Sequence, residues 1–85
     1  MPVVFRQGRT TFSLYSWEGE PREPAHVHVS VGRNEAKFWL RPEVTLAYNQ
    51  GLSGPDLSRY ARLIRERRDE IEQRWHEHFG DGPSR

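Results

Sequence analysis

The chain has 85 residues, with 13 basic and 12 acidic side chains, three tryptophans and no cysteine. One small domain is expected at this length, and the missing cysteine excludes disulfides and zinc–thiolate sites. The net charge of +1 is too small for a protein that binds nucleic acid through its overall charge.

The first elements predict a β-hairpin followed by a loop. Residues 3–6 and 9–15 are rich in strand-forming side chains and flank Gln7-Gly8, which predicts a two-residue turn. This register pairs Phe5 with Thr10 and Val3 with Phe12. Residues 16–24 contain glycine, two prolines and three glutamates, and predict a polar, mobile loop.

Residues 24–31, Pro-Ala-His-Val-His-Val-Ser-Val, alternate strictly between apolar and polar types. Since side chains of a strand point to opposite faces in turn, this segment predicts a half-buried strand. Its valines are expected to face the core. Its histidines, His26 and His28, are expected to lie side by side on the opposite, exposed face.

A second hairpin is predicted from a turn at Arg33-Asn34. This register sets Val29 against Phe38 and Val27 against Leu40 on the apolar face. On the reverse face the expected pairs are Ser30 with Lys37, His28 with Trp39 and His26 with Arg41. A shift by one residue would set valines against Lys37 and Trp39, so the pattern specifies which side faces the core. Val44, Leu46 and Tyr48 alternate and predict a short fifth strand.

The apolar period changes to that of a helix after Gly51. Ser53 is a favourable N-cap, and Pro55 is tolerated in a first helical turn. Apolar residues then follow at helical spacing: Leu57, Tyr60, Ala61, Ile64, Ile71, Trp75 and Phe79. One helix over about residues 54–79 is expected. The predicted fold is α+β: a single domain over 1–85, with an antiparallel four- or five-stranded sheet, one long C-terminal helix packed on one face, and a flexible tail from about residue 80.

The histidine face is the candidate site. Imidazoles at His26 and His28 could transfer protons as catalytic groups, Trp39 could stack on a base, and Arg41 could pair with a phosphate beside Lys37. We favour a surface for a protein partner over these nucleic-acid roles, and a plain structural surface is the third alternative.

Two further features of the helix bear on ligands. Arg68 falls in the middle of the apolar stripe, so it must find a carboxylate, backbone carbonyls or an anionic ligand. His76 and His78 diverge by ~160° on a helix, unlike the i, i+4 pairs that bind zinc. We therefore expect no metal and no cofactor, and no established catalytic motif is present.

Four stretches together are similar to one protein family. They are Pro-Val-Val-Phe-Arg at 2–6, Glu-Pro-Ala-His-Val-His-Val at 23–29, Glu-Ala-Lys-Phe-Trp-Leu at 35–40 and Trp-His-Glu-His-Phe at 75–79. The chain resembles DUF4160, a family of small uncharacterised bacterial proteins. The resemblance implies a gene often found beside that of another small protein, in an arrangement similar to toxin–antitoxin modules. It supplies no catalytic residues.

Three hypotheses follow from these observations. The first is a cytoplasmic component of a toxin–antitoxin-like module that binds a small protein encoded nearby and acts on RNA or DNA. The second is a hydrolase, ribonuclease or metal-binding protein that uses His26 and His28. The third is a plain protein-interaction domain. Self-association is left open, and no apolar run approaches the ~20 residues of a membrane span.

Overall fold

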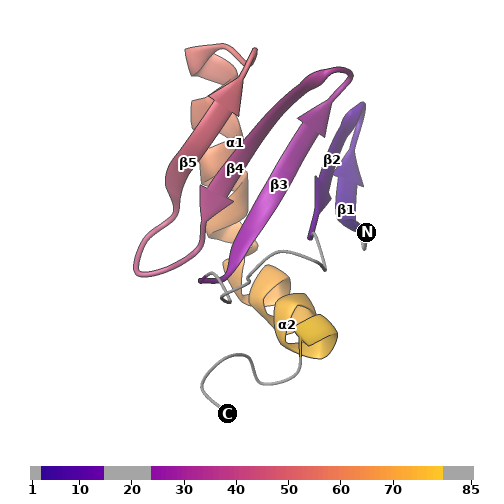
Figure 1. The fold of residues 1–85 in the computed structure, drawn as a ribbon, viewed down its shortest axis with the longest axis vertical. Coiled ribbons are helices and arrows are strands. Elements are labelled where there is room, and N and C mark those ends of the chain that lie inside the picture. Colours follow the sequence, from indigo (N-terminus) through magenta and orange to yellow (C-terminus); the bar gives the residue numbers. More distant parts are fainter. Residues whose placement is uncertain (1–2, 15–23, 80–85) are drawn as a thin grey trace.

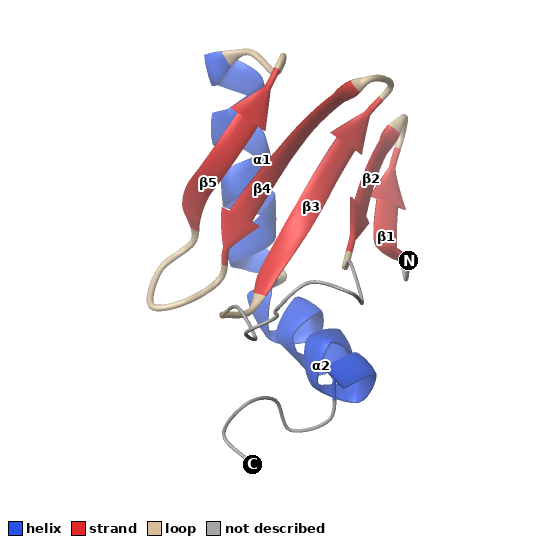
Figure 2. Ribbon diagram, in the orientation of Figure 1, coloured by secondary structure: helices blue, strands red, loops and turns tan. Residues whose placement is uncertain are grey.

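The computed structural model describes residues 3–14 and 24–79, which form five strands and two helices (Figures 1 and 2). The elements are β1 (Val3–Gln7), β2 (Thr10–Ser13), β3 (His26–Val31), β4 (Asn34–Trp39), β5 (Thr45–Gln50), α1 (Gly54–Glu66) and α2 (Arg68–Phe79). The strands form one antiparallel sheet in the order β1-β2-β3-β4-β5. The α+β class and the fifth strand are therefore confirmed. The predicted mobile loop, apart from Pro24, and the predicted tail lie outside the described residues.

The β3–β4 turn is at Gly32-Arg33, and it pairs Val31 with Asn34, Val29 with Ala36 and Val27 with Phe38. The predicted turn at Arg33-Asn34 is wrong by one position, which shifts the register by two residues. Gly32 has a φ of 59°, and a glycine at the first central position suits a tight hairpin turn. Because a two-residue shift preserves the side-chain alternation, each residue still lies on its predicted face.

The β1–β2 turn shows the same displacement. Gln7 pairs with Thr10 and Phe5 with Phe12, around a turn at Gly8-Arg9. Gly8 has a φ of 61°, so the glycine again occupies the first turn position. An irregularity between Val3 and Phe5 interrupts the pairing, and it leaves Val4 buried at the core. The ring of Phe5 stacks on that of Phe12, with centroids 4.3 Å apart.

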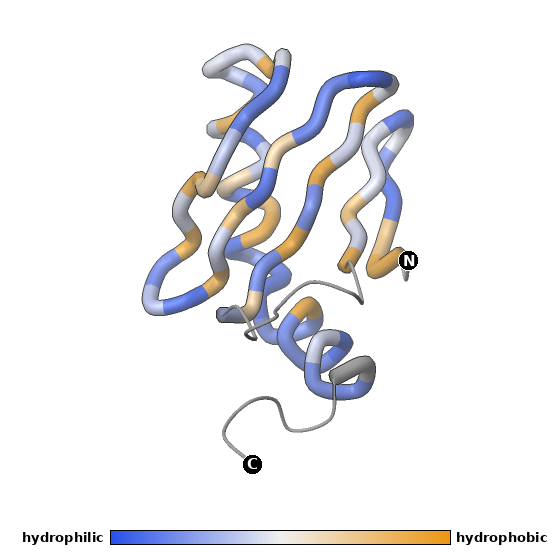
Figure 3. Tube along the Cα trace, in the orientation of Figure 1, coloured by the Kyte–Doolittle hydropathy of each residue, from blue (hydrophilic) through white to orange (hydrophobic). Residues whose placement is uncertain are grey.

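The valine face of the sheet and the apolar side of α1 form the core. Figure 1 shows α1 crossing behind the strands, and Figure 3 shows apolar positions recurring along both layers. Tyr60 of α1 packs edge-on to Phe12, and its hydroxyl lies 3.1 Å from Thr10 Oγ1. One buried cluster contains residues from the strands and both helices: Val27, Val29, Phe38, Leu40, Ile64, Ile71 and Trp75. The shared core expected from the two apolar patterns is confirmed.

The single long helix is wrong, because α1 ends at Glu66 and α2 begins at Arg68. Arg67 between them has φ −113° and ψ 19°, outside the helical region. The charges mark this break. Arg65 lies in the last turn of α1, whereas Asp69 and Glu70 lie in the first turn of α2, as the helix dipole favours at a C-terminus and an N-terminus. Neither helix has the length and apolar content needed to cross a membrane.

Side chains on both sides of the break stabilise the change of direction. The Arg67 guanidinium lies 3.5 Å from the Phe5 ring centroid and donates two hydrogen bonds to Glu70. Arg68 donates to the Leu40 carbonyl at 3.4 Å. A continuous helix would have directed Arg68 into the core, where its charge would be costly. The break therefore gives two arginines polar partners and turns α2 under the end of the sheet (Figure 1).

Ser53 caps α1 as expected, because its Oγ accepts a hydrogen bond from the Asp56 backbone N–H at 3.3 Å. Replacing Ser53 with alanine removes that acceptor and should lower the free energy of unfolding by about 0.5–2 kcal/mol. Urea denaturation of the two proteins measures the difference. Ser58→Ala, at an exposed position inside the helix, is the control. An S53A midpoint equal to that of the wild type would contradict the capping role.

Candidate functional site

His26 and His28 lie on the sheet face opposite to the valines, as predicted, but they are not exposed. Their exposed fractions are 0% and 1%, and their ring centroids are 5.3 Å apart. The ring of Trp75, from α2, lies 4.9 Å from the His26 ring. The expectation of an open histidine face is therefore wrong. The turn at Arg67 carries α2 under the end of the sheet, where Trp75 meets His26.

Hydrogen bonds fix the orientation of both imidazoles. His26 Nδ1 lies 2.8 Å from the Pro24 carbonyl oxygen. Because that oxygen can only accept, His26 Nδ1 carries a proton. His28 Nδ1 lies 3.1 Å from Glu35 Oε2, and the Tyr48 hydroxyl donates to the same oxygen at 3.0 Å. In the neutral imidazoles, Nε2 of each ring is then the acceptor nitrogen.

A carboxylate that orients an imidazole is the arrangement used by general bases, and the His28–Glu35 pair has this form. A general base must also reach the proton that it abstracts. Both imidazoles are buried, so a substrate could meet them only after part of the chain moved. The described geometry fits a polar network that joins β3, β4 and β5 better than it fits an open catalytic site.

Lys37 and Trp39 lie on the same face as the histidines. Lys37 of β4 pairs with His28 of β3 on one side and with Tyr48 of β5 on the other. It is buried, with its Nζ 4.6 Å from the centroid of the Trp39 ring, which is a favourable cation–π distance. Trp39 is half-buried and pairs with His26. The structure thus brings together four of the six residues singled out in the sequence.

Arg41 and Arg68 lie elsewhere, where the segment after β4 meets α2. Arg41 donates two hydrogen bonds to the Glu72 carboxylate, at 2.6 and 2.8 Å. This bond and the adjacent positive charge lower the pKa of Glu72, and the same pairing raises the pKa of Arg41. Arg68 uses the Leu40 carbonyl, one of the three kinds of partner expected. The predicted pairing of Arg41 with His26 is wrong, because Trp39 occupies that position.

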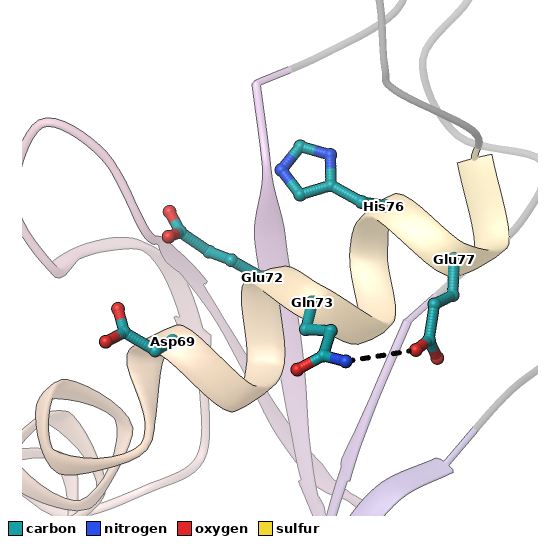
Figure 4. Close-up of a pocket in the computed structure, with 5 residues that line it drawn as sticks. All are labelled: Asp69, Glu72, Gln73, His76 and Glu77. Carbon is teal, nitrogen blue, oxygen red and sulfur yellow. Dashed lines mark hydrogen bonds between the residues drawn. The ribbon is translucent and has the colours of Figure 1, made fainter.

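A hollow of about 620 Å³ runs along α2 and is lined by five of its polar side chains (Figure 4): Asp69, Glu72, Gln73, His76 and Glu77. Glu72 and His76 project to one side of the helix, whereas Gln73 and Glu77 are bonded to each other at 3.4 Å. Within the described residues, no three potential ligands converge as a metal site requires. The side chain of His78 lies outside the description.

The two buried histidines and the side chains around them form what we call the histidine network: His26, His28, Glu35, Lys37, Trp39, Tyr48 and Trp75. The sequence analysis did not predict three of these members, namely Glu35, Tyr48 and Trp75. Glu35 pairs with Ser30, two residues from His28, which brings its carboxylate diagonally across from the imidazole. The glycine of the turn was the available signal. A turn placed at Gly32-Arg33 predicts this pairing, whereas the turn at Arg33-Asn34 sets Glu35 against Gly32.

Comparison with known families shows to which family the chain belongs. The model of a family described as "Domain of unknown function (DUF4160)" matches residues 10–76. The chain belongs to the DUF4160 family. The DUF4160 match runs from β2 into α2 and includes every residue of the histidine network. Neither a curated protein nor a solved structure matched the chain.

Proposed function

We propose that this DUF4160 protein is a cytoplasmic member of a bacterial toxin–antitoxin-like pair, and that it binds its small partner protein through the outer edge of β5. One observation carries the proposal. Leu46 and Tyr48 are 45% and 40% exposed, and they are the exposed large hydrophobic residues of the described chain. Both belong to β5, a strand at the edge of the sheet.

The β5 edge lacks the charged residues and proline that commonly protect an edge strand against pairing. An edge strand presents unpaired backbone donors and acceptors, and proteins commonly protect it with charged residues or proline. None of the six residues of β5, Thr-Leu-Ala-Tyr-Asn-Gln, is of either kind. Such an edge suits strand addition, in which a partner supplies backbone hydrogen bonds and alternating side chains.

A bulge in the β4–β5 pairing places the two exposed side chains on opposite faces of the sheet. Tyr48 pairs with Lys37 but Leu46 pairs with Phe38, because the register shifts between these positions. Leu46 and Tyr48 therefore lie on opposite faces of the sheet and flank the free edge from both sides. We propose as occupant an extended, apolar strand of the partner protein, with side chains that contact Leu46 on one face and Tyr48 on the other.

The histidine network supports the Tyr48 side of this surface. Tyr48 is bonded to Glu35, which in turn holds His28, so its ring has a fixed orientation. Half-buried Trp39 lies on the same face as Tyr48. Rigid aromatic side chains of this kind dominate the binding energy of many interfaces. In this proposal the histidines position a binding surface, and their burial disfavours the alternative of a hydrolase centred on them.

Replacing Leu46 with lysine should weaken binding to the protein encoded by the neighbouring gene by about tenfold or more, because a charge would enter the apolar contact. Isothermal titration calorimetry with the two purified proteins measures this loss. Gln73→Lys adds the same charge at an exposed position of α2 and should bind like the wild type.

Two outcomes would contradict the proposal. An L46K protein that binds the neighbour-encoded protein as tightly as the wild type would exclude the β5 edge. A wild-type protein that forms dimers by itself, and an L46K variant that remains monomeric, would show that a second copy occupies the edge. Light scattering at several protein concentrations distinguishes this case.

A further inference from the structure

The outer side of α1 carries a row of arginines that the β5 edge does not use, and only Arg59 among them contacts the core, through the hydroxyl and ring of Tyr60. Arg59, Arg62 and Arg65 are exposed and follow each other at intervals of three residues. At 1.5 Å rise per residue, the row spans about 9 Å of helix. Tyr60 and Ile64, the buried residues of α1, secure the other side of the helix to the sheet. The row is therefore presented by a helix whose position is fixed.

These arginines differ in their partners from the three arginines around the bend between α1 and α2. Arg41, Arg67 and Arg68 are held by Glu72, Glu70 and the Leu40 carbonyl. In contrast, Arg62 and Arg65 form no ion pair or hydrogen bond with any described residue, and Arg59 pairs only with Asp56 among carboxylates, at 3.1 Å.

The same arginines surround a hollow of about 320 Å³, which is also lined by Pro55 and Ser58. The described residues that line this hollow include no carboxylate. A second hollow of about 330 Å³ adjoins it, shares Arg59 and Arg62, and is also lined by Glu66 and by Gln7 of β1. Three guanidinium groups and a serine hydroxyl around one concave surface provide many hydrogen-bond donors with a local excess of positive charge.

We propose that this arginine row, Arg59, Arg62 and Arg65, binds the phosphate backbone of a nucleic acid. Guanidinium groups match phosphate oxygens with two parallel hydrogen bonds, and their weak hydration makes the exchange from water to phosphate favourable. The low total charge does not oppose this, because the charges are unevenly placed. The three arginines of α1 lie together on its outer side against Asp56 and Glu66 within the helix, whereas α2 carries four acidic residues and two arginines. The site goes beyond the proposed partner binding and does not depend on it.

The chemistry of the row also defines the type of binding. The described residues around the two hollows include no exposed aromatic ring that could stack on a base. Contacts would therefore be made to phosphates, which position a nucleic acid but carry no sequence information. Binding should be independent of sequence and should weaken steeply with salt, because each neutralised phosphate releases counterions.

Fluorescence anisotropy with a labelled duplex DNA and a labelled single-stranded RNA tests the proposal. For three phosphate contacts on duplex DNA, log K should fall against log salt with a slope of about −3 between about 50 and 200 mM NaCl. The double variant Arg62→Ala, Arg65→Ala should bind about tenfold or more weakly, with a slope smaller by about two. Its thermal melting should match that of the wild type, since both side chains are exposed.

Two matched variants separate this site from net charge and from the β5 edge. Arg74→Ala together with Arg33→Ala removes two exposed arginines elsewhere and should leave nucleic-acid binding within about twofold. Leu46→Lys should also retain it while losing the protein partner. Equal losses in the R62A/R65A and R33A/R74A variants would overturn the site, as would undetectable binding of both nucleic acids. Poly-glutamate that competes as well as the nucleic acids would assign the row to an acidic protein instead.

Discussion

Val29→Asp should unfold the protein at room temperature. Val29 is fully buried, paired with Phe12 of β2 and Ala36 of β4 in the middle of the sheet. A carboxylate there would have no ionic partner, and such a group costs several kcal/mol. The free energy of unfolding of a whole domain is about 5–15 kcal/mol, and a domain of this size has little margin. Circular dichroism and one-dimensional proton NMR would show loss of the native structure.

The control for this substitution is Thr45→Asp, which places the same group at an exposed strand position. We expect its melting temperature to remain close to that of the wild type. If the V29D protein kept dispersed methyl resonances and melted like the wild type, the central register of the sheet would be wrong.

His26→Ala should lower the free energy of unfolding by about 2–4 kcal/mol, through a cavity and a lost hydrogen bond. The His26 ring is fully buried, with the Trp39 and Trp75 rings 5.7 and 4.9 Å from it. Its removal would also leave the Pro24 carbonyl without its 2.8 Å hydrogen bond. Urea denaturation followed by tryptophan fluorescence suits the measurement, because two tryptophans contact the site.

His76→Ala provides the comparison, since His76 is an exposed histidine on α2. Its free energy of unfolding should change by less than about 0.5 kcal/mol. If the two histidine variants were equally stable, His26 would contribute no packing. That result would support the exposed histidine face predicted from the alternation of the strand. The predicted difference therefore tests the burial of His26 directly.

The fold was largely predictable because its faces are encoded in short patterns. Alternation in residues 24–31 assigned the valines and histidines to opposite faces, and this assignment survived an error in the turn. The predicted turn at Arg33-Asn34 is one position too late. Gly32, with a φ of 59°, is the first of the two central turn residues, and the prediction placed it in the strand instead. Two hairpins showed the same error, so the glycine was the better indicator in both.

The site was less predictable because its burial depends on the direction of α2. Periodicity joins Ile64 to Ile71 on one stripe, and it carries no sign of the bend at Arg67. Two features mark the break: Arg68 interrupts the apolar stripe, and a basic residue before the bend is followed by an acidic one, Asp69, after it. Without that bend, Trp75 would not contact His26, and the histidines would be expected on an open surface.

The order of strands in the sheet also determines when contacts form during synthesis. Each strand pairs only with its neighbours along the chain, so the sheet can form one strand pair after another as the chain lengthens. The contact between His26 and Trp75 is different, because the two residues are 49 positions apart in the sequence. On the ribosome, where a chain grows from its N-terminus, β3 is complete long before Trp75 is made. A nascent chain therefore carries a His26 ring that lacks its Trp75 neighbour until α2 emerges and docks.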